Sequence, residues 1–420
     1  MPLDVSIIGL GRVGLPLALS FADRGLSVLG VDNDPDRLEA VRAARMPFDE
    51  AGTQELLERV SESSRLSLSD RVVDAAQADH VVITLGTPSF SHIEIDMRAI
   101  RSALDDLLPV LRPGHSLILR STIAPGTTDF VAGYLAKQRG FDIGEEIFVA
   151  HAPERIAAGR FLEEIGTLPC IVGGVGEHSG EQVGRLFEVF GAPIVQTTPV
   201  QAELAKIWTN ILRYTHFALP NLLMMDCEQY GANVFDVIDL INRDYPRGGI
   251  ARPGLTAGSC LRKDFAFSEE RSHAPGMLLA VSRVNESVPQ FLVEGIKRRT
   301  GGDLAGRKVA VLGLAFKRDT DDERDSLSHK LVRLLERELA DVAVHDPRVA
   351  TPTQPFGETV LDAQVIVIAT NHSDFERPGT LQAIADSAAS DCLIVDPWNS
   401  LGAAQVFAYA PEVAALTAAR

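Results

Sequence analysis

Residues 5–14 read VSIIGLGRVG, and this stretch decides the fold of the first part of the chain. A short apolar strand runs directly into Gly9, Gly11 and Gly14, and an apolar helical segment follows. In such a turn the first glycine allows the bend. The second lets a pyrophosphate approach the backbone, and the third packs helix against strand. The pattern predicts a dinucleotide site, with Arg12 and Val13 in the loop that contacts it.

The identity of the dinucleotide follows from Asp32, which ends the next apolar strand. An acidic residue at this spacing bonds the adenosine ribose. A carboxylate also repels a 2′-phosphate, so we expect NAD rather than NADP. A glycine turn without any ligand is the competing interpretation, and the strand, the helix and Asp32 together disfavour it.

Strand and helix patterns alternate on both sides of this turn. Apolar strands are expected at 5–11, 26–33, 80–86, 116–122, 147–153 and 169–174, and again at 308–316, 342–347, 364–371 and 392–399. Between them, from about 199 to 293, the pattern is that of long helices. We therefore predict two Rossmann-like α/β domains with doubly wound parallel sheets, at 1–198 and 301–420, joined by a helical domain at 199–300.

Composition excludes several classes of protein. The 420 residues exceed one hydrophobic core, and the net charge of −17 disfavours a nucleic-acid partner. No apolar run is long enough to span a bilayer, and the N-terminal residues lack the basic segment of a signal peptide, so a cytoplasmic protein is expected. Four scattered cysteines without CxxC spacing predict neither a metal site nor a disulfide framework.

The second α/β segment begins GLAFKRDTDDERDS at 313–326 and lacks the glycine triplet, because Leu-Ala follows Gly313. A second dinucleotide is not expected there. A nucleotide site with Lys317 and Arg324 as phosphate partners and a solvated, charge-rich loop are both consistent with the composition.

One cysteine differs in its setting from the other three. Cys170, Cys227 and Cys392 lie in strand-like or helical apolar runs, where a thiol packs as a small hydrophobic group. Cys260 instead lies in LTAGSCLRKDFA, residues 255–266, after Gly258 and Ser259 and before Lys263 and Asp264. If a helix starts there, its N-terminal dipole favours the thiolate, which is the reactive form.

Seven motifs occur in one order along nearly the whole chain. They are GLGRVGLPLA, GTP at 86–88, STIAPGTT at 121–128, APER at 152–155, ELAKIWTN at 203–210, GSCLRKD at 258–264 and GLAFKRDTDDERDS at 313–326. In this set the chain resembles the nucleotide-sugar 6-dehydrogenase family, which comprises the UDP-glucose, GDP-mannose and UDP-N-acetylhexosamine dehydrogenases. Each motif alone is modest, and the ordered set is specific.

The resemblance implies a four-electron oxidation of a sugar C6 alcohol to a uronic acid with two NAD. Cys260 matches the cysteine that adds to the intermediate aldehyde as a thiohemiacetal, and a second hydride transfer then leaves a thioester for water to open. Lys206 and Asn210 match residues that stabilise the oxyanion and bond the substrate or water. Asp264 would orient Lys206 and the water, and Glu154 would serve acid/base chemistry or water positioning.

The resemblance also assigns the remaining candidates. Thr87, Pro88, Ser121, Thr122 and Lys263 would line the nicotinamide side, with Thr122 also close to the chemistry. The substrate would be held by Glu154, Arg155, Lys206, Asn210, Gly258 and Ser259, and its nucleotide half by Phe316, Lys317 and Arg324. Arg247 resembles an arginine that reaches the substrate of a partner subunit. A homodimer is expected from the family and from the long apolar helix.

The motifs conflict over the sugar. SCLRKD resembles the glucose and mannose enzymes, whereas APERIAAGRF resembles the N-acetylhexosamine enzymes and places Ala158 where the glucose type has a second acid. We expect UDP-glucose, with dTDP-glucose or a UDP-N-acetylhexosamine as the alternative. Arg155 and Arg160 are specificity residues or surface charges. The product would supply a polysaccharide or a small natural product.

Two other interpretations remain to be separated from this one. A one-step hydroxyacid dehydrogenase would leave Cys260 and the last α/β domain without a role. A non-catalytic nucleotide-sugar sensor would not need Cys260, Lys206, Asn210 and Asp264 together.

Overall fold

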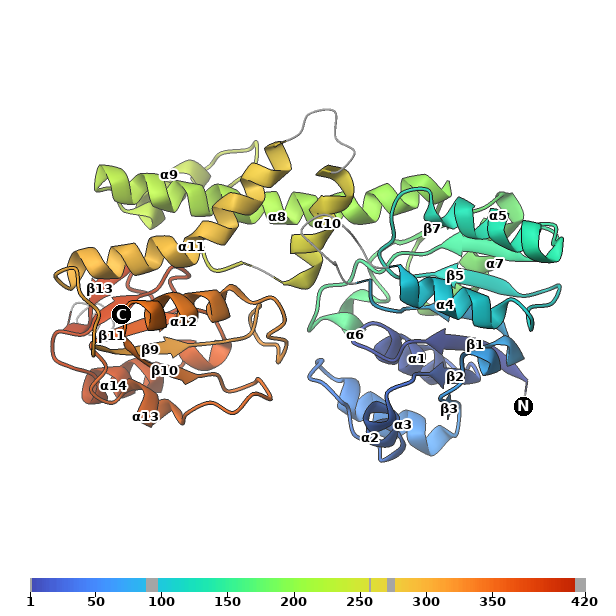
Figure 1. Ribbon diagram of the computed structural model, residues 1–420, viewed down its shortest axis with the longest axis horizontal. Helices are drawn as coiled ribbons and strands as arrows, with labels where there is room; N and C mark the ends of the chain where they lie inside the picture. Colours follow the sequence, from blue (N-terminus) through green and yellow to red (C-terminus); the bar gives the residue numbers. More distant parts are fainter. Residues whose placement is uncertain (1, 88–96, 257, 270–275, 412–420) are drawn as a thin grey trace. The chain divides into compact units, whose positions relative to one another are not determined.

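The computed structural model describes residues 2–87, 97–256, 258–269 and 276–411, so that Pro88 lies outside the described residues. The chain forms two compact units. The first comprises Met1–Thr209 with Lys263–Arg271, and the second Asn210–Arg262 with Ser272–Arg420. Each unit is built on one β-sheet (Figure 1).

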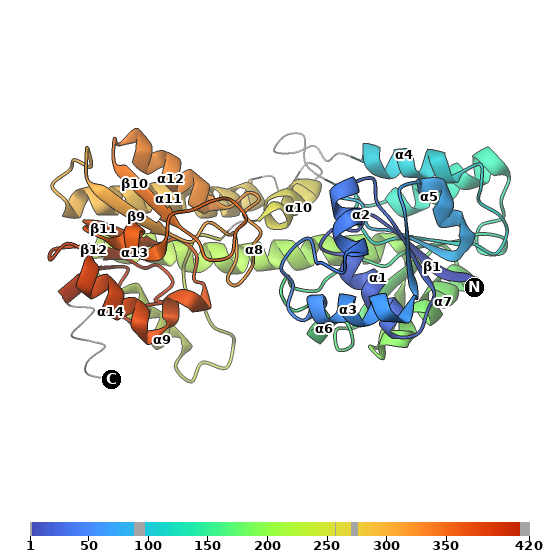
Figure 2. The ribbon, with the colours of Figure 1, turned by 90° about the horizontal axis from the view of Figure 1, so that it is seen from below.

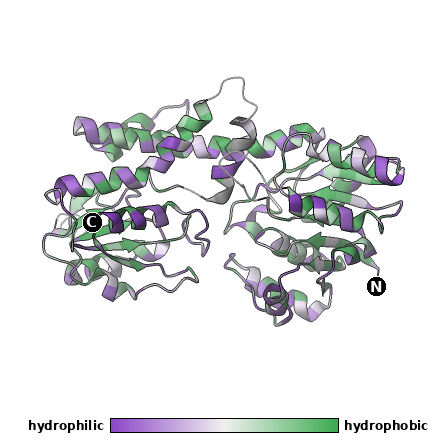
Figure 3. Cartoon of the chain, in the orientation of Figure 1, coloured by the Kyte–Doolittle hydropathy of each residue, from purple (hydrophilic) through white to green (hydrophobic). Residues whose placement is uncertain are grey.

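The sheet of the first unit has eight strands in the order β3-β2-β1-β4-β5-β6-β7-β8. Their bounds are β1 (Leu3–Ile8), β2 (Val28–Val31), β3 (Leu66–Ser69), β4 (Ala78–Ile83), β5 (Ser116–Leu119), β6 (Phe148–His151), β7 (Cys170–Gly174) and β8 (Ile194–Thr197). Neighbouring strands run parallel except β6 and β7, which pair antiparallel. Most residues of the central strands are buried, and Figure 3 shows these strands as largely hydrophobic.

Helices cover both faces of this sheet. One face packs against α1 (Gly14–Asp23), α2 (Pro35–Arg42), α3 (Thr53–Ser63), α6 (Phe161–Glu164) and α7 (Glu177–Phe187). The other packs against α4 (Arg98–Leu107) and α5 (Thr127–Arg139). Strand residues alternate between these two cores, as the period of a strand requires.

The sheet of the second unit has the order β10-β9-β11-β12-β13. Its strands are β9 (Lys308–Leu312), β10 (Asp341–His345), β11 (Val365–Ile368), β12 (Leu393–Val395) and β13 (Phe407–Tyr409). The helices α11 (Met277–Arg299) and α12 (Leu327–Arg337) cover one face, whereas α13 (Phe356–Val360) and α14 (Pro378–Ser387) cover the other (Figure 2).

Long helices fill the middle of the sequence, as predicted. They are α8 (Pro199–Tyr230), α9 (Val234–Asn242), α10 (Ser259–Glu269) and α11. The helix α8 continues through Pro220. Among the described residues, no helix is both long and apolar enough to cross a membrane.

The expected fold class, two parallel-sheet α/β folds with a helical middle, is confirmed, and two details differ. The sheets are not wholly parallel, because β7 runs antiparallel to β6 and β13 runs antiparallel to β12. The short strands β3, β8 and β13 also lie where no strand was expected. Much of β3 and β8 is only partly buried, so their sequences lack a continuous apolar run.

The turn after the first strand is built twice, once in each unit. Gly9 and Gly313 both have a φ of 98°, a value that glycine adopts without strain. The next backbone N–H, of Leu10 or Leu314, donates to a buried carboxylate at 2.6 Å, from Asp32 or Asp346. Each carboxylate follows the neighbouring strand, so the same hydrogen bond ties two strand ends together in both sheets.

The two turns differ at the position after the leucine. A Cβ at Gly11 would have nothing within 4 Å, whereas the second unit has Ala315, whose N–H also donates to Asp346. Open space beside the backbone at Gly11 is what a pyrophosphate needs. At Gly14 a Cβ would lie 1.9 Å from the carbonyl oxygen of Gly9. These two glycines are therefore required for different reasons.

A buried histidine ends β6. The side chain of His151 is fully buried, and its Nδ1 donates to the carbonyl oxygen of Leu119 at 2.8 Å. Within the described residues its Nε2 has no hydrogen-bond partner. Burial, aided by the positive charges of Arg120 and Lys206, lowers the pKa of His151 to about 4.

Because the two glycines have different roles, an added methyl group should lower stability at Gly14 and weaken NAD binding at Gly11. Gly14→Ala should destabilise the fold by roughly 2–3 kcal/mol, because the methyl overlaps the backbone of Gly9. Gly11→Ala should fold normally and raise the KM for NAD at least about tenfold, since the methyl occupies the open space beside the loop. Urea denaturation and NAD titration separate the two effects, and equal stability of both variants would contradict this assignment.

The buried imidazole of His151 predicts a loss of stability in acid. Its folded pKa lies below the unfolded value, so its contribution is complete above pH 6.5 and disappears as the pH falls toward 4. The difference corresponds to about 3 kcal/mol. His151→Asn can keep the bond to Leu119 without titrating, so its free energy of unfolding should fall less between pH 7 and pH 4. Parallel slopes for the two proteins would argue against burial as the cause.

Candidate functional site

Two loops at the carboxyl ends of β4 and β5 are joined by hydrogen bonds. Thr87 donates from its hydroxyl to the carbonyl oxygen of Thr122 at 2.8 Å, and Ser121 donates to the carbonyl oxygen of Leu85 at 2.6 Å. Lys263, from α10, donates to the hydroxyl of Thr87 at 2.8 Å and to its carbonyl oxygen at 3.0 Å. The structure thus brings together four of the residues expected on the nicotinamide side.

The glycine loop and Asp32 form the other part of the expected cofactor site. Besides Leu10, the Asp32 carboxylate accepts the backbone N–H of Asp34 at 3.0 Å and a bond from Arg37 at 2.8 Å. Val13 precedes the first turn of α1, and Arg12 stacks on the ring of Phe48, 5.1 Å from its centre. The buried acid and the open backbone at Gly11 fit an adenosine ribose and a pyrophosphate.

Glu154 is fixed by a residue that the sequence analysis missed. Arg120, at the end of β5, donates to the Glu154 carboxylate at 2.6 Å, and both side chains are almost entirely buried. The backbone N–H groups of Arg155 and Ile156 donate to the other carboxylate oxygen at 2.7 and 2.8 Å. Three hydrogen-bond donors thereby hold Glu154 in the loop after β6. No spacing signal links Arg120 to Glu154, because the sheet register brings them together.

A second carboxylate holds the next part of that loop. Glu50 is buried and accepts the N–H groups of Gly159 and Phe161, each at 2.9 Å. Arg155 donates to the carbonyl oxygen of Pro169 at 2.6 Å, and Arg160 pairs with Glu163 at 2.8 Å. Ala158, where the glucose type has an acid, is exposed. Arg160 is exposed, and a contact of either arginine with the sugar stays a prediction.

The helix α8 carries two candidates and an anchor. Glu203 is fully buried, and its carboxylate accepts the N–H groups of Gly126 at 2.6 Å and Thr128 at 2.8 Å, which caps the N-terminus of α5. This bond connects the motifs STIAPGTT and ELAKIWTN, which sequence reasoning had left separate. Lys206 follows one turn later and is half-buried, and Asn210 comes after a further turn and is buried.

The helix α10 begins at the predicted cysteine motif. Gly258, with a φ of 113°, precedes it, and Cys260 is its second residue. A Cβ at Gly258 would lie 2.7 Å from the ring of Phe316, so two expected substrate residues are in close contact. The Asp264 side chain is fully buried, and its Oδ1 lies 3.9 Å from the Nζ of Lys263. Cys260 and Asn210 belong to the second unit and Lys206 and Asp264 to the first, so their common site stays a prediction.

The remaining candidates lie in the second unit. Lys317 is half-buried in the loop after β9, and the exposed Arg324 donates to the Asp322 carboxylate of the same loop at 2.6 and 2.8 Å. Arg247 is exposed and stacks on Tyr245, 4.7 Å from the centre of its ring. Its expected reach into a partner subunit stays a prediction.

Comparison with known proteins covers most of the chain. Residues 3–191 match the NAD binding domain of the UDP-glucose/GDP-mannose dehydrogenase family, 200–287 its central domain and 310–403 its UDP binding domain. These three matches follow the order of the two sheets and the helical middle, and they support NAD as the cofactor.

Relatives with named substrates are similar over nearly their full length. UDP-N-acetyl-D-mannosamine dehydrogenase of Pyrococcus horikoshii is 32% identical over 379 residues, which are 89% of this chain and 90% of that protein. The solved structure of UDP-D-ManNAc dehydrogenase from Pyrococcus horikoshii has a TM-score of 0.87 at 31% identity, covering 94% and 95% of the two chains. A UDP-glucose dehydrogenase from Pyrobaculum islandicum has a TM-score of 0.84 at 29% identity, covering 94% of each.

The dinucleotide turn, the cysteine motif at the start of α10 and the three matched domains lead to one conclusion. This chain belongs to the UDP-glucose/GDP-mannose dehydrogenase family of NAD-dependent nucleotide-sugar dehydrogenases.

Proposed function

We propose that this chain oxidises the C6 alcohol of a UDP-N-acetylhexosamine to the carboxylate, with UDP-N-acetyl-D-mannosamine as the first substrate to test. The similarity to UDP-N-acetyl-D-mannosamine dehydrogenases supports this sugar over the UDP-glucose that we expected from SCLRKD. The loop after β6 supports it as well, because it carries Arg155 and Ala158 in place of the glucose-type residues. UDP-glucose is the second candidate, favoured by the likeness to the Pyrobaculum enzyme.

The observation that carries the reaction class is the position of Cys260. It lies in the first turn of α10, where backbone N–H groups have no intrahelical partner and favour a thiolate. The first oxidation would convert the C6 alcohol to an aldehyde. The Cys260 sulfur then forms a bond to C6, and the resulting thiohemiacetal retains a hydrogen that a second oxidation removes as hydride. Water opens the thioester to the carboxylate and returns the thiol.

Bound NAD would supply the hydride acceptor in both oxidations. Thr87, Ser121, Thr122 and Lys263 would hold its nicotinamide side, because their loops end β4 and β5 and are already bonded to one another. Each turnover consumes one alcohol, one water and two NAD. It yields one carboxylate, two NADH and three protons.

Four charged or polar residues would assist the addition of the thiol to the aldehyde and the hydrolysis of the thioester. We assign oxyanion stabilisation to Lys206 and substrate or water binding to Asn210, since they lie one turn apart on α8. Asp264 would orient Lys206 and the hydrolytic water. Glu154 would act mainly as an anionic positioning group, because Arg120 and two backbone N–H groups already occupy its carboxylate.

The second unit would bind the nucleotide half of the substrate. Phe316 lies against Gly258, directly before the cysteine helix, so its loop would extend from the sugar toward the nucleotide. Lys317 and Arg324 would provide positive charge for the diphosphate.

An apolar stripe on α8 supports a homodimer. Leu204, Trp208, Leu212, Leu219 and Leu222 are 40%, 50%, 55%, 52% and 45% exposed. Their spacings of four, four, seven and three residues place them on one face of the helix. A continuous exposed stripe of large apolar side chains is typical of a surface that a second subunit covers.

The first prediction from this proposal is the amount of NADH formed per sugar. With UDP-N-acetylmannosamine, UDP-N-acetylglucosamine, UDP-glucose, dTDP-glucose and GDP-mannose offered separately, we expect two NADH per UDP-N-acetylmannosamine and slower turnover of the others. Absorbance at the NADH band and mass spectrometry of the product measure this. If UDP-glucose has the highest kcat/KM, it would replace UDP-N-acetylmannosamine as the proposed substrate. One NADH per sugar would reject the four-electron reaction.

Cys260→Ser is the control for the same experiment. The hydroxyl occupies almost the same volume, so folding and NAD binding should persist while acid formation falls by at least about a thousandfold. Cys227→Ser is the matched control, because that buried thiol lies on α8 and has no proposed chemical role. Full acid formation by Cys260→Ser would refute the covalent route.

The apolar stripe predicts that one charge is enough to separate the subunits. Leu212→Lys should shift the sedimenting species from dimer to monomer at micromolar concentration, because an unpaired charge would be buried in the interface. Val110→Lys, at another exposed apolar residue outside α8, should leave the dimer intact. A monomeric wild-type protein, or a Leu212→Lys variant that is still a dimer, would exclude this helix face as the dimer interface.

A further inference from the structure

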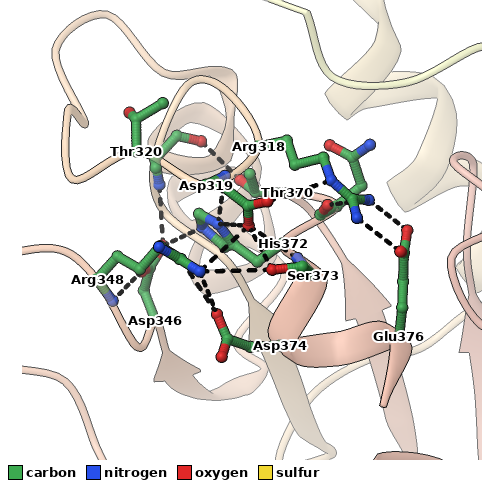
Figure 4. Close-up of polar contacts among 12 residues, drawn as sticks. Arg318, Asp319, Thr320, Asp346, Arg348, Thr370, His372, Ser373, Asp374 and Glu376 are labelled. Carbon is green, nitrogen blue, oxygen red and sulfur yellow. Dashed lines mark hydrogen bonds and ion pairs between the residues drawn. The ribbon is translucent and has the colours of Figure 1, made fainter. Parts of the chain in front are cut away.

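The nucleotide loop of the second unit is tied down by a buried histidine that the family motifs did not single out. The loop, residues 313–326, follows β9, and His372 follows β11 in the same sheet. Figure 4 shows His372 in the middle of a polar cluster, with Asp319 of the loop on one side and Asp346, which follows β10, on the other.

The contacts of His372 assign a different role to each of its ring nitrogens. Its side chain is fully buried, and its Nδ1 accepts the backbone N–H of Asp319 at 3.0 Å. An acceptor nitrogen carries no proton, so the proton of the neutral ring is on Nε2. Nε2 donates to the Asp346 carboxylate at 3.2 Å. The imidazole therefore links the nucleotide loop to the end of β10 as one defined tautomer.

The Asp346 carboxylate is itself held in place by several backbone N–H groups. It is buried and also accepts the N–H groups of Leu314 at 2.6 Å, Ala315 at 3.0 Å and Arg348 at 2.8 Å. Burial acts to raise its pKa, but the bonds from His372 and these backbone groups hold the pKa of Asp346 well below its ordinary value. The carboxylate stays ionised, and the start of the nucleotide loop is fixed to it.

Asp319 of this loop has a strained backbone conformation that its neighbours hold in place. Its φ of 55° is in the left-handed region, which costs free energy for a residue other than glycine. Its carboxylate accepts the backbone N–H of Ser373 at 2.8 Å and the Ser373 hydroxyl at 2.9 Å, and it pairs with Arg348 at 3.4 Å. The segment 371–373 thus binds Asp319 through both its backbone and its side chain.

We propose that His372 is a positioning residue for nucleotide binding, which fixes Asp319 and so sets the backbone from which Phe316 and Lys317 project. His372 would act only through Asp319 and Asp346, because it is itself buried. The proposal rests on the proposed function, in that this loop holds the nucleotide half of the substrate. A purely structural histidine would affect stability alone, whereas a positioning residue affects nucleotide affinity with the fold intact.

Two isosteric substitutions separate the two bonds of His372. His372→Asn places an amide oxygen near Nδ1 and can still accept the Asp319 N–H, while it loses the donor to Asp346. His372→Gln places an amide nitrogen near Nε2 and can still donate to Asp346, while it leaves the Asp319 N–H without its acceptor. We expect His372→Gln to weaken UDP binding and raise the KM for the UDP-sugar about tenfold, equivalent to roughly 1.4 kcal/mol.

The same experiment also tests the kinetic constants that should change little. His372→Gln should retain kcat within about threefold and the wild-type KM for NAD, because the NAD loops belong to the other unit. His372→Asn should bind UDP within about threefold of wild type. Calorimetric titration with UDP and steady-state kinetics provide these numbers. UDP affinity unchanged in His372→Gln, or lowered equally in both variants, would overturn the role assigned to the Asp319 bond.

A second variant covers the possibility that the histidine variants do not fold. Asp319→Gly adopts the left-handed backbone without strain and removes the carboxylate that Ser373 and Arg348 hold. It keeps the backbone N–H that His372 accepts, so it tests the side-chain anchor of residue 319. UDP affinity should fall about tenfold as well, and an unchanged affinity would overturn the claim that a fixed residue 319 sets the nucleotide loop. Absence of UDP binding by the wild-type protein would instead reject the nucleotide site itself, so the two failures are distinguishable.

Discussion

A buried carboxylate that accepts backbone N–H groups is the interaction on which the loops of both units depend. Asp32, Glu154, Glu203 and Asp346 each bind two or more donors from the backbone of a turn or a helix N-terminus. An ionised carboxylate is costly to bury unless such donors surround it. The cost is offset only when the loop adopts one conformation, so each acid specifies the path of the chain where a strand ends.

The repeated turn shows how one local fold can match two different binding domains. Asp32 and Asp346 bind their turns with bonds of equal length, which makes the two sheets local copies of one another at this point. Gly11 leaves open space beside the first turn, which a pyrophosphate needs. In the second turn Ala315 takes this place, and its N–H donates to Asp346. The first unit therefore matches an NAD binding domain and the second a UDP binding domain.

In the function that we propose, specificity for the sugar depends on the loop after β6, and residues outside this loop hold its conformation. The segment after β6 is held by Arg120 through Glu154 and by Glu50 through Gly159 and Phe161. Its exposed face carries Ala158, where the glucose-type relatives place a second acid. A loop with a fixed backbone and a changed side chain can accept a different sugar while the cysteine chemistry stays the same.

The sequence by itself determined the α/β fold class and the NAD turn at Gly9–Gly14 with Asp32, and it singled out Cys260 as the cysteine that would lie at a helix N-terminus if a helix followed Gly258 and Ser259. These features follow from strand and helix periods and from turn glycines, all of which act between neighbours in the chain. Only the tertiary structure decided that Arg120 binds Glu154, that Glu203 caps α5 and that His372 holds Asp319. Those partners are 34, 75 and 53 residues apart. Strand pairing and the packing of helices bring them together, and no local pattern of residues encodes which side chains will meet.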